Sequence, residues 1–393
     1  MTGTTTTTTA TIESTRTASV SDPSVRLTPV VSSLSAEPRP SASAPHDRAR
    51  TAWSAYVESA PRATLFHHPL WSEAVQAVFG HEPLHLVAKR GENIVGLLPL
   101  MEVRSLLAGR LLVSMPYATY GGILADDEEV RDALAAEAVQ LAWRRGARVL
   151  ELRSAQATIP GFELDERYAG FLRALPQRLD DLQTFLPRKA RAAARQARQR
   201  EQLTVRHDTG GTDIGNADLQ LVELVWTLYA RNMRRLGSLA YPRRFFTELV
   251  RRLRKRAWVT TVWRDRRPVA GLLSFVFSDT VMPYFVGVDE RVRCTGCTNL
   301  LYLTVMERAV ACGLRRFDFG RSRRDNHGSF AFKCNQGFEP QVLGYQRCVP
   351  PGRKAPDLTP SNPRFALARR LWRHLPLWLT SRLGGWLSRS IPG

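Results

Sequence analysis

Several side chains near the end of the sequence have the chemistry that group transfer requires. Transfer of a group to a nucleophile needs that nucleophile unprotonated, a group that stabilises the developing negative charge and a path for the released proton. Asp318 ends a predicted strand, where its carboxylate could orient an amine or accept its proton, or could instead hold Arg321 in a structural ion pair. His327 lies in a polar loop and could act as a base, although a single loop histidine is usually only solvated.

A second candidate is the basic segment 186–200, which is rich in alanine and arginine. Both are strong helix formers, so we expect one helix with a positive face. Guanidinium groups bind phosphate in bidentate fashion, which would suit a nucleotide-linked or lipid-linked sugar as an anionic acceptor. The alternative is a nonspecific basic surface. The candidate substrate-binding residues of this helix are Arg188, Lys189, Arg191 and Arg195.

The whole chain is strongly basic, with a net charge of +20 over 393 residues. Such a charge favours an anionic partner: a nucleic acid, a membrane surface or a phosphorylated substrate. The basic segment has no interleaved aromatic residues, which argues against a base-stacking platform. Binding of tRNA or another nucleic acid therefore stays an alternative function.

The five cysteines predict neither a disulfide framework nor a metal site. Cys294 and Cys297 have the spacing of a zinc half-site, but Cys312, Cys334 and His327 offer no second pair of ligands. The odd number of cysteines fits a reducing cytoplasm. We also expect no secretory signal and no membrane-spanning helix, because no long uncharged apolar window occurs.

The elements that must position these residues occur twice in the same order. Predicted hairpins at 84–100 and 257–278 are followed by a strand, a helix that ends at a glycine, and a strand with an acidic residue. Glu151 lies five residues after Gly146, and Asp318 lies five residues after Gly313. This internal repeat predicts two similar α/β units, and Glu151 is the counterpart of Asp318.

The segment from Cys312 to Ser322 and the segment from Gly328 to Pro340 carry a family resemblance. The strand end Asp-Phe-Gly-Arg-Ser, the Phe-Lys pair and the Gly-Phe-Glu-Pro turn resemble Fem-like acyltransferases of the GNAT superfamily, in the branch associated with exosortase/PEP-CTERM systems and exopolysaccharide loci. The resemblance covers residues 53–347 and implies tandem GNAT-like domains, with mixed sheets flanked by helices and a cleft between them.

The resemblance also implies an activity: transfer of an acyl or aminoacyl group to an envelope or exopolysaccharide precursor. The donor would be acyl-CoA or aminoacyl-tRNA, with no bound cofactor. Lys333 matches the lysine of the Phe-Lys pair, whose charge would stabilise the substrate or the transition state. Arg321 and Phe332 are expected at the substrate.

The sequence departs from this pattern at Phe330, Cys334 and Gln336, and in the loop 323–327. These changes leave open a noncatalytic scaffold that binds a membrane surface.

The end of the chain mixes arginine with tryptophan and leucine, and residues 364–392 predict an amphipathic element broken at Pro376 and at Gly384–Gly385. It would either contact the inner face of the membrane peripherally or dock on the domains. The expected organisation is a disordered tail at 1–46, a first domain at 47–185, the basic helix at 186–200, a second domain at 201–349, and a proline-rich linker with the amphipathic tail at 350–393.

Overall fold

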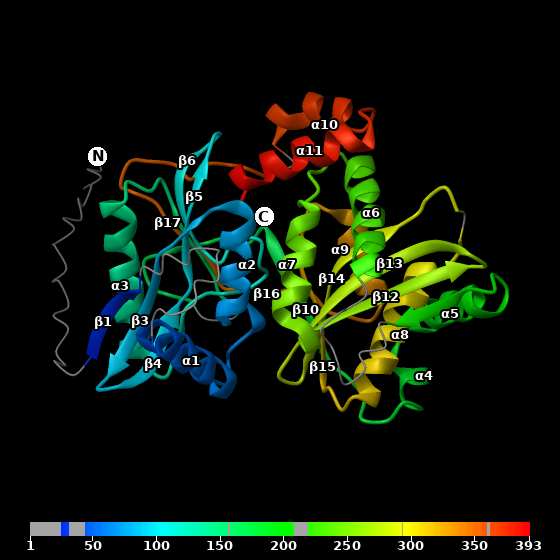
Figure 1. The fold of residues 1–393 in the computed structure, drawn as a ribbon, viewed down its shortest axis with the longest axis horizontal. Helices are drawn as coiled ribbons and strands as arrows, with labels where there is room; N and C mark the ends of the chain where they lie inside the picture. Colours follow the sequence, from blue (N-terminus) through cyan, green and yellow to red (C-terminus); the bar gives the residue numbers. More distant parts are fainter. Residues whose placement is uncertain (1–24, 31–43, 156–157, 208–218, 293, 360–361) are drawn as a thin grey trace, which may run out of the picture.

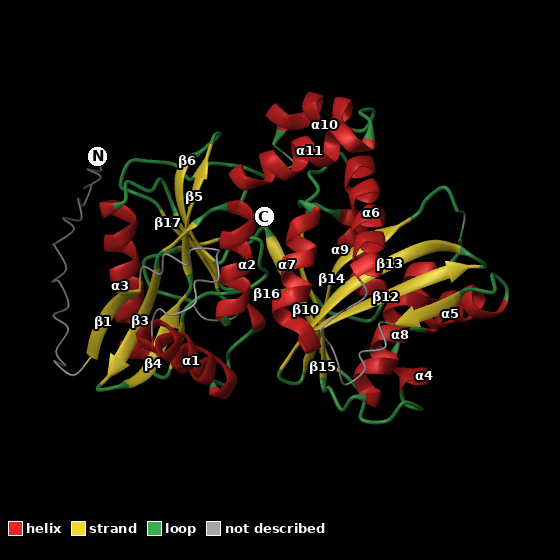
Figure 2. Ribbon diagram, viewed as in Figure 1, coloured by secondary structure: helices red, strands yellow, loops and turns green. Residues whose placement is uncertain are grey.

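The computed structural model describes residues 25–30, 44–155, 158–207, 219–292, 294–359 and 362–393. It has two α/β units side by side, with the last helices of the chain lying across the edge where they meet (Figure 1). Each unit has mixed sheets flanked by helices (Figure 2). The predicted fold class is therefore confirmed in its layers and in its repetition.

The first unit follows the predicted order. Helices α1 (Ala44–Ser59) and α2 (Pro69–Phe79) precede the hairpin of β3 (His85–Arg90) and β4 (Asn93–Leu98). Pro99 interrupts what the sequence predicted as one strand, and β5 (Leu100–Ser105) continues into another sheet because proline cannot donate to a ladder. The unit continues with β6 (Gly109–Ser114), α3 (Glu128–Arg144) and β8 (Leu150–Arg153).

The second unit repeats this order around a seven-stranded sheet. Its strands lie in the order β11-β12-β13-β14-β15-β10-β16. The helices are α6 (Leu219–Leu236), α7 (Arg243–Leu253), α8 (Cys297–Ala311) and α9 (His327–Asn335). The strands are β11 (Thr204–His207), β12 (Ala257–Arg264), β13 (Arg267–Phe277), β14 (Thr280–Val288), β15 (Arg316–Arg323), β10 (Tyr168–Ala174) and β16 (Gln341–Val342).

The units exchange strands, so the sheets do not follow the boundaries expected at residues 185 and 349. Strand β10 precedes the basic helix in sequence but pairs with β15 of the second unit. Strand β17 (Tyr345–Cys348) follows the second unit but pairs with β8 of the first. These pairings join segments far apart in sequence, which local patterns do not report.

Each unit contains one pair of parallel strands that part after a short contact. Strands β6 and β8 pair only at Leu112–Leu150 and Val113–Glu151. Strands β14 and β15 pair only at Thr280–Arg316 and Val281–Phe317. Each unit therefore has its own V-shaped opening between two parallel strands. The acidic residue of each repeat, Glu151 or Asp318, lies at or beside the vertex.

An aromatic core holds the two units together. Trp71 on α2 packs against Phe245 of α7 and Phe275 of β13, with ring centroids 6.0 and 5.5 Å apart. The three rings are almost fully buried. Buried aromatic pairs contribute strongly to interfaces, so this core fixes the geometry of the junction.

The two ends of the chain differ from the expectation in detail. Residues 25–30, expected within a disordered tail, form β1 (Val25–Val30) along the open edge of β3, and α1 begins before the expected domain start. In the tail, α10 (Ala366–Trp372) ends before Pro376 as predicted. Helix α11 (Leu377–Leu387) instead runs through Gly384–Gly385. A Cβ at Gly384 would lie 3.2 Å from the Ala240 carbonyl oxygen, so the glycine allows the helix to pack closely there.

Candidate functional site

Asp318 lies where β14 and β15 part. It directly follows Phe317, the last residue of β15 that pairs with β14, and its side chain is 3% exposed. The Gly320 N–H donates to its carboxylate at 2.7 Å. Burial raises the pKa of Asp318 to about 6, against the opposing effects of the Gly320 N–H, the Tyr120 hydroxyl and the Lys333 charge. A carboxyl with this pKa changes protonation near neutral pH, as a general base must.

The first unit supplies the partner of Asp318. Its loop 115–122 crosses to the second unit, where Tyr284 donates to the Tyr117 carbonyl at 2.7 Å, and Tyr345 of β17, in the sheet of the first unit, donates to the Thr119 carbonyl. These bonds place the Tyr120 hydroxyl at the carboxyl of Asp318. Burial raises the pKa of Tyr120 well above its usual value, so the hydroxyl keeps its proton and can donate it.

Asp318 does not end its strand as the sequence predicted, because β15 continues to Arg323, and Lys333 lies against the middle of this strand. Its ammonium donates to the carbonyls of Phe319 at 2.7 Å and Arg321 at 2.9 Å. Burial lowers the pKa of Lys333 to about 7, while the charge of Asp318 acts in the opposite direction. Lys333 therefore holds the backbone on both sides of Gly320, and its charge lies close enough to act on Asp318.

Arg321 faces the junction. Its guanidinium lies over the rings of Tyr168, at 4.5 Å, and Tyr345, at 5.4 Å. Among the ion pairs of the described residues, none joins Arg321 to Asp318. The structure therefore does not support the structural ion pair that the sequence left open, and it leaves the carboxyl of Asp318 without a salt bridge.

The other residues singled out in the sequence differ in burial and in partners. Phe332 on α9 is half-buried against Tyr302 and Phe319, with ring centroids 5.6 and 6.4 Å apart, so it packs beside the strand end. His327 is exposed at the start of α9. Glu151 carries ion pairs to Arg153 at 2.8 Å and Arg347 at 3.6 Å, unlike its counterpart Asp318.

The basic segment forms α5 (Arg188–Gln199), close to its predicted bounds. Its alanines face α8, and α5 lies at the outer end of the second unit, away from the junction (Figure 1). The structure therefore does not bring these basic residues to Asp318. Arg191 donates to the Gln183 carbonyl; exposed side chains are those of Arg188, Lys189 and Arg195.

Sequence reasoning missed a basic hollow in the second unit. Its volume is about 750 Å³, and its wall includes Arg231, Arg267 and Arg291 from α6, β13 and the loop after β14. Asp289 in the wall pairs with Arg291 at 2.6 Å and with Arg231 at 3.6 Å. The three arginines are far apart in sequence, so no local pattern predicts that they line one hollow. Within the described ranges, no group of three or more metal-binding side chains occurs.

Residues 186–333 match the family model of the acetyltransferase (GNAT) domain. This segment contains the β14–β15 opening, Asp318 and Lys333, so the candidate site lies within the part of the chain that matches the GNAT model. None of the curated proteins compared with the chain matches it in sequence.

Solved structures extend the likeness to both units. A crystal structure of FemX superposes with a TM-score of 0.60 at 15% identity, over 77% of this chain and 96% of FemX. A C-terminal domain from Agrobacterium fabrum, described as that of a lysylphosphatidylglycerol synthetase, gives a TM-score of 0.50 at 13% identity, over 78% of this chain and 92% of that domain. At these identities the likeness shows the fold alone, over both units of this chain.

Proposed function

We propose that this GNAT-type acyltransferase transfers an acyl group to an envelope or exopolysaccharide precursor, with Asp318 as the proton acceptor. The observation that carries the proposal is the buried carboxyl of Asp318 at the vertex of the β14–β15 opening, with a pKa raised to about 6 by burial. The chain places Tyr120 of the other unit on the same carboxyl.

The residues divide the work of the reaction. The nucleophile of the acceptor attacks the acyl carbonyl carbon, the bond between that carbon and the donor breaks, and the nucleophile's proton passes to Asp318, directly or through water. The Tyr120 hydroxyl orients the carboxylate. Lys333 positions the strand end through its two carbonyl contacts.

The donor we favour is acyl-CoA. Beyond Val281, the edge of β14 that faces β15 has no strand partner in the paired register, so its backbone groups can pair with the amides of an extended pantetheine arm. The hollow with Arg231, Arg267 and Arg291 lies beyond the end of β14 and suits phosphate groups. Aminoacyl-tRNA is the alternative donor, and the exposed basic face of α5 favours it.

The acceptor would be a nucleotide-linked or lipid-linked sugar, met at the inner face of the membrane by a cytoplasmic protein. Support comes from the tail, where Trp378 and Trp386 are 68% and 56% exposed. Exposed arginines alternate with these rings, a pattern typical of helices that lie in an anionic bilayer interface. No helix in the described part of the chain is long and apolar enough to cross a membrane.

Mass spectrometry of envelope precursors and exopolysaccharide tests the proposal. We would compare wild-type cells with a deletion strain complemented by wild-type protein, by Asp318→Asn or by Asp265→Asn. Asp265 is an exposed turn residue with φ of 53°, a conformation that asparagine adopts readily, so it is a matched control. The proposal is supported if the precursor or exopolysaccharide loses one acyl mass in the deletion strain and in the Asp318→Asn strain, but not in the wild-type or Asp265→Asn strains. Identical masses in all strains would instead favour a scaffold.

A further inference from the structure

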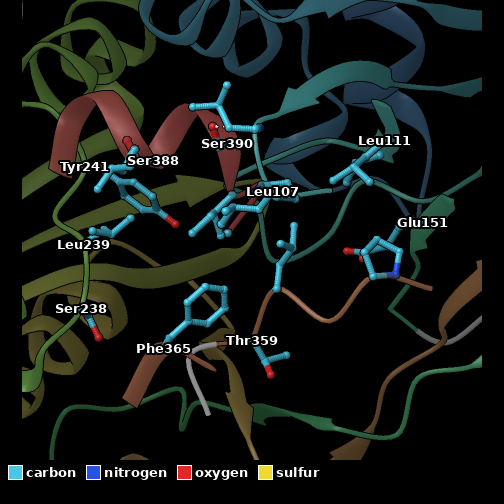
Figure 3. Close-up of a pocket in the computed structure, with 18 of the residues that line it drawn as sticks. Leu107, Leu111, Glu151, Ser238, Leu239, Tyr241, Thr359, Phe365, Ser388 and Ser390 are labelled. Atoms are coloured by element: carbon cyan, nitrogen blue, oxygen red, sulfur yellow. Dashed lines mark hydrogen bonds between the residues drawn. The ribbon is translucent and has the colours of Figure 1, made fainter. Parts of the chain in front are cut away.

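A large apolar pocket lies outside the β14–β15 opening. Its volume is about 620 Å³, within the range of small-molecule sites. Three parts of the chain build its wall: β6 and β8 with the β5–β6 hairpin, the α6–α7 connection, and the tail. Figure 3 shows Leu107 and Leu111 from the first unit, Leu239 and Tyr241 from the second, and Phe365 from the tail around the hollow.

The pocket is bordered by exposed apolar side chains. Leu106 and Leu107, at the tip of the β5–β6 hairpin, line the pocket and are 69% and 57% exposed. Leu367 and Leu371 of α10 do not line the pocket, and at 69% and 58% exposure they extend the apolar surface beyond it. Figure 1 places the hairpin tip and α10 along the same edge of the molecule, beside α11. An apolar hollow that opens among exposed leucines favours a ligand that leaves a membrane.

One wall of the pocket is polar and leads toward the candidate site. Arg347 pairs there with Glu151 at 3.6 Å and with Asp165 at 2.8 Å. Tyr168 also lines the pocket. The guanidinium of Arg321 lies 4.5 Å from the centre of the Tyr168 ring. Because Arg321 is on the strand that carries Asp318, a ligand with a polar end at Tyr168 would approach the reacting groups from the first unit.

We propose that this pocket binds a single long hydrocarbon chain, with its polar end toward Tyr168 and Glu151 and its apolar end toward the hairpin and tail. The chain belongs either to a lipid-linked acceptor or to a long-chain acyl donor. Each methylene of a hydrocarbon chain that moves from water into an apolar pocket contributes about 0.8 kcal/mol to binding. An apolar pocket of this size therefore favours such a chain. The proposal rests on the proposed function only for the role of the chain as part of a substrate.

The experiment measures binding without turnover. The probe is a fluorescent palmitate analogue, titrated into the full-length Asp318→Asn protein below its micelle concentration. Saturable binding of one equivalent is the expected result. Two tryptophan variants on α10 locate the site: Ala368 lines the pocket and is exposed, whereas Ala366 is exposed on the same helix and does not line it. Ala368→Trp should weaken binding about tenfold, the loss of about two buried methylenes, and Ala366→Trp should not.

Competition identifies the source of the chain. Displacement of the probe by polyprenyl phosphate at lower concentration than by palmitoyl-CoA assigns the chain to the acceptor, and the reverse order assigns it to the donor. Absence of saturable binding, or equal effects of both tryptophan variants, overturns the pocket. Acyl transfer to a water-soluble acceptor without probe binding would support the proposed function and contradict the hydrocarbon-binding pocket. Probe binding without any acyl transfer would support the pocket and contradict the proposed function.

Discussion

The hydroxyl of Tyr120 meets the carboxyl of Asp318 across the junction of the two units. Tyr120 comes from the loop after β6, and Asp318 comes from β15 near the other end of the chain. Two further tyrosines clamp the loop by their hydroxyls, Tyr284 on Tyr117 and Tyr345 on Thr119. The site is therefore complete only when both units are folded and docked.

Asp318→Asn should abolish most of the activity, because the amide keeps the shape of the carboxyl but cannot accept a proton. General-base catalysis contributes roughly 10²- to 10⁴-fold, so kcat should fall within that range while the thermal midpoint stays the same or rises. The rise would follow from removal of a buried charge. Steady-state kinetics with Asp265→Asn as the control decides it; a kcat within twofold of wild type would contradict the role of Asp318.

The activity should rise with pH through the pKa of Asp318. Burial raises this pKa to about 6, so the carboxyl is protonated and inactive below that value and accepts protons above it. The same raised pKa makes the folded state bind the proton more tightly than the unfolded state. This group's contribution to stability is therefore greatest below its unfolded value of 3.8 and is lost as pH rises through about 6. A pH profile of kcat together with pH-dependent unfolding measures both effects.

Tyr120→Phe should move the ascending limb of that profile to higher pH. The Tyr120 hydroxyl lowers the pKa of Asp318, and a hydrogen bond of ordinary strength corresponds to about 0.5–1 pH unit. Tyr56→Phe is the matched control, because Tyr56 also donates to an aspartate, Asp126 at 2.8 Å, far from the site. An unchanged limb in Tyr120→Phe would show that the acceptor's own titration, and not that of Asp318, sets the profile.

Local patterns in the sequence predicted the elements of both units, because each hairpin and each glycine-terminated helix is set by neighbouring residues. The exchange of strands between the units was not predicted, because β10 and β17 pair with strands that are distant in sequence. Asp318 and Lys333 were predicted from the sequence, and the structure brings them close together, while their roles stay a prediction. Tyr120 was missed because a tyrosine in a loop of the other unit carries no local signal, and the arginine-lined hollow was missed for the same reason.

Basic composition predicted the face of α5 but not its place in the fold. The opposite side of the helix packs through Ala190, Ala194 and Ala197, which are buried. The composition did not predict that the partner is α8 at the outer end of the second unit. Charge patterns report what a surface could bind, whereas its distance from the reacting groups depends on tertiary packing.

Lys333→Met should reduce stability as well as activity, because Lys333 positions the strand end. The substitution keeps the length of the side chain but leaves the carbonyls of Phe319 and Arg321 without their donor. Unsatisfied buried acceptors cost about 1–3 kcal/mol each, so the two carbonyls predict a loss of about 2–6 kcal/mol in unfolding free energy. Lys189→Met on the exposed face of α5 is the control. Denaturant unfolding separates this role from a purely catalytic one, which would lower kcat and leave stability unchanged.

The tail should bind anionic vesicles through its exposed tryptophans and arginines. Trp378 and Trp386 lie on the exposed side of α11, while Thr380 and Gly384 face the protein, so Trp378→Ser with Trp386→Ser removes membrane contacts without opening the core. We expect at least about tenfold weaker partitioning into phosphatidylglycerol vesicles, and weaker binding of wild-type protein in high salt or to neutral phosphatidylcholine. Leu179→Ser is the control, because Leu179 is 49% exposed and lies outside the tail. Sedimentation with vesicles measures the partitioning. Equal partitioning of the tail variant and the control would show that the tail is only a docked element and that the basic charge of the chain serves another partner.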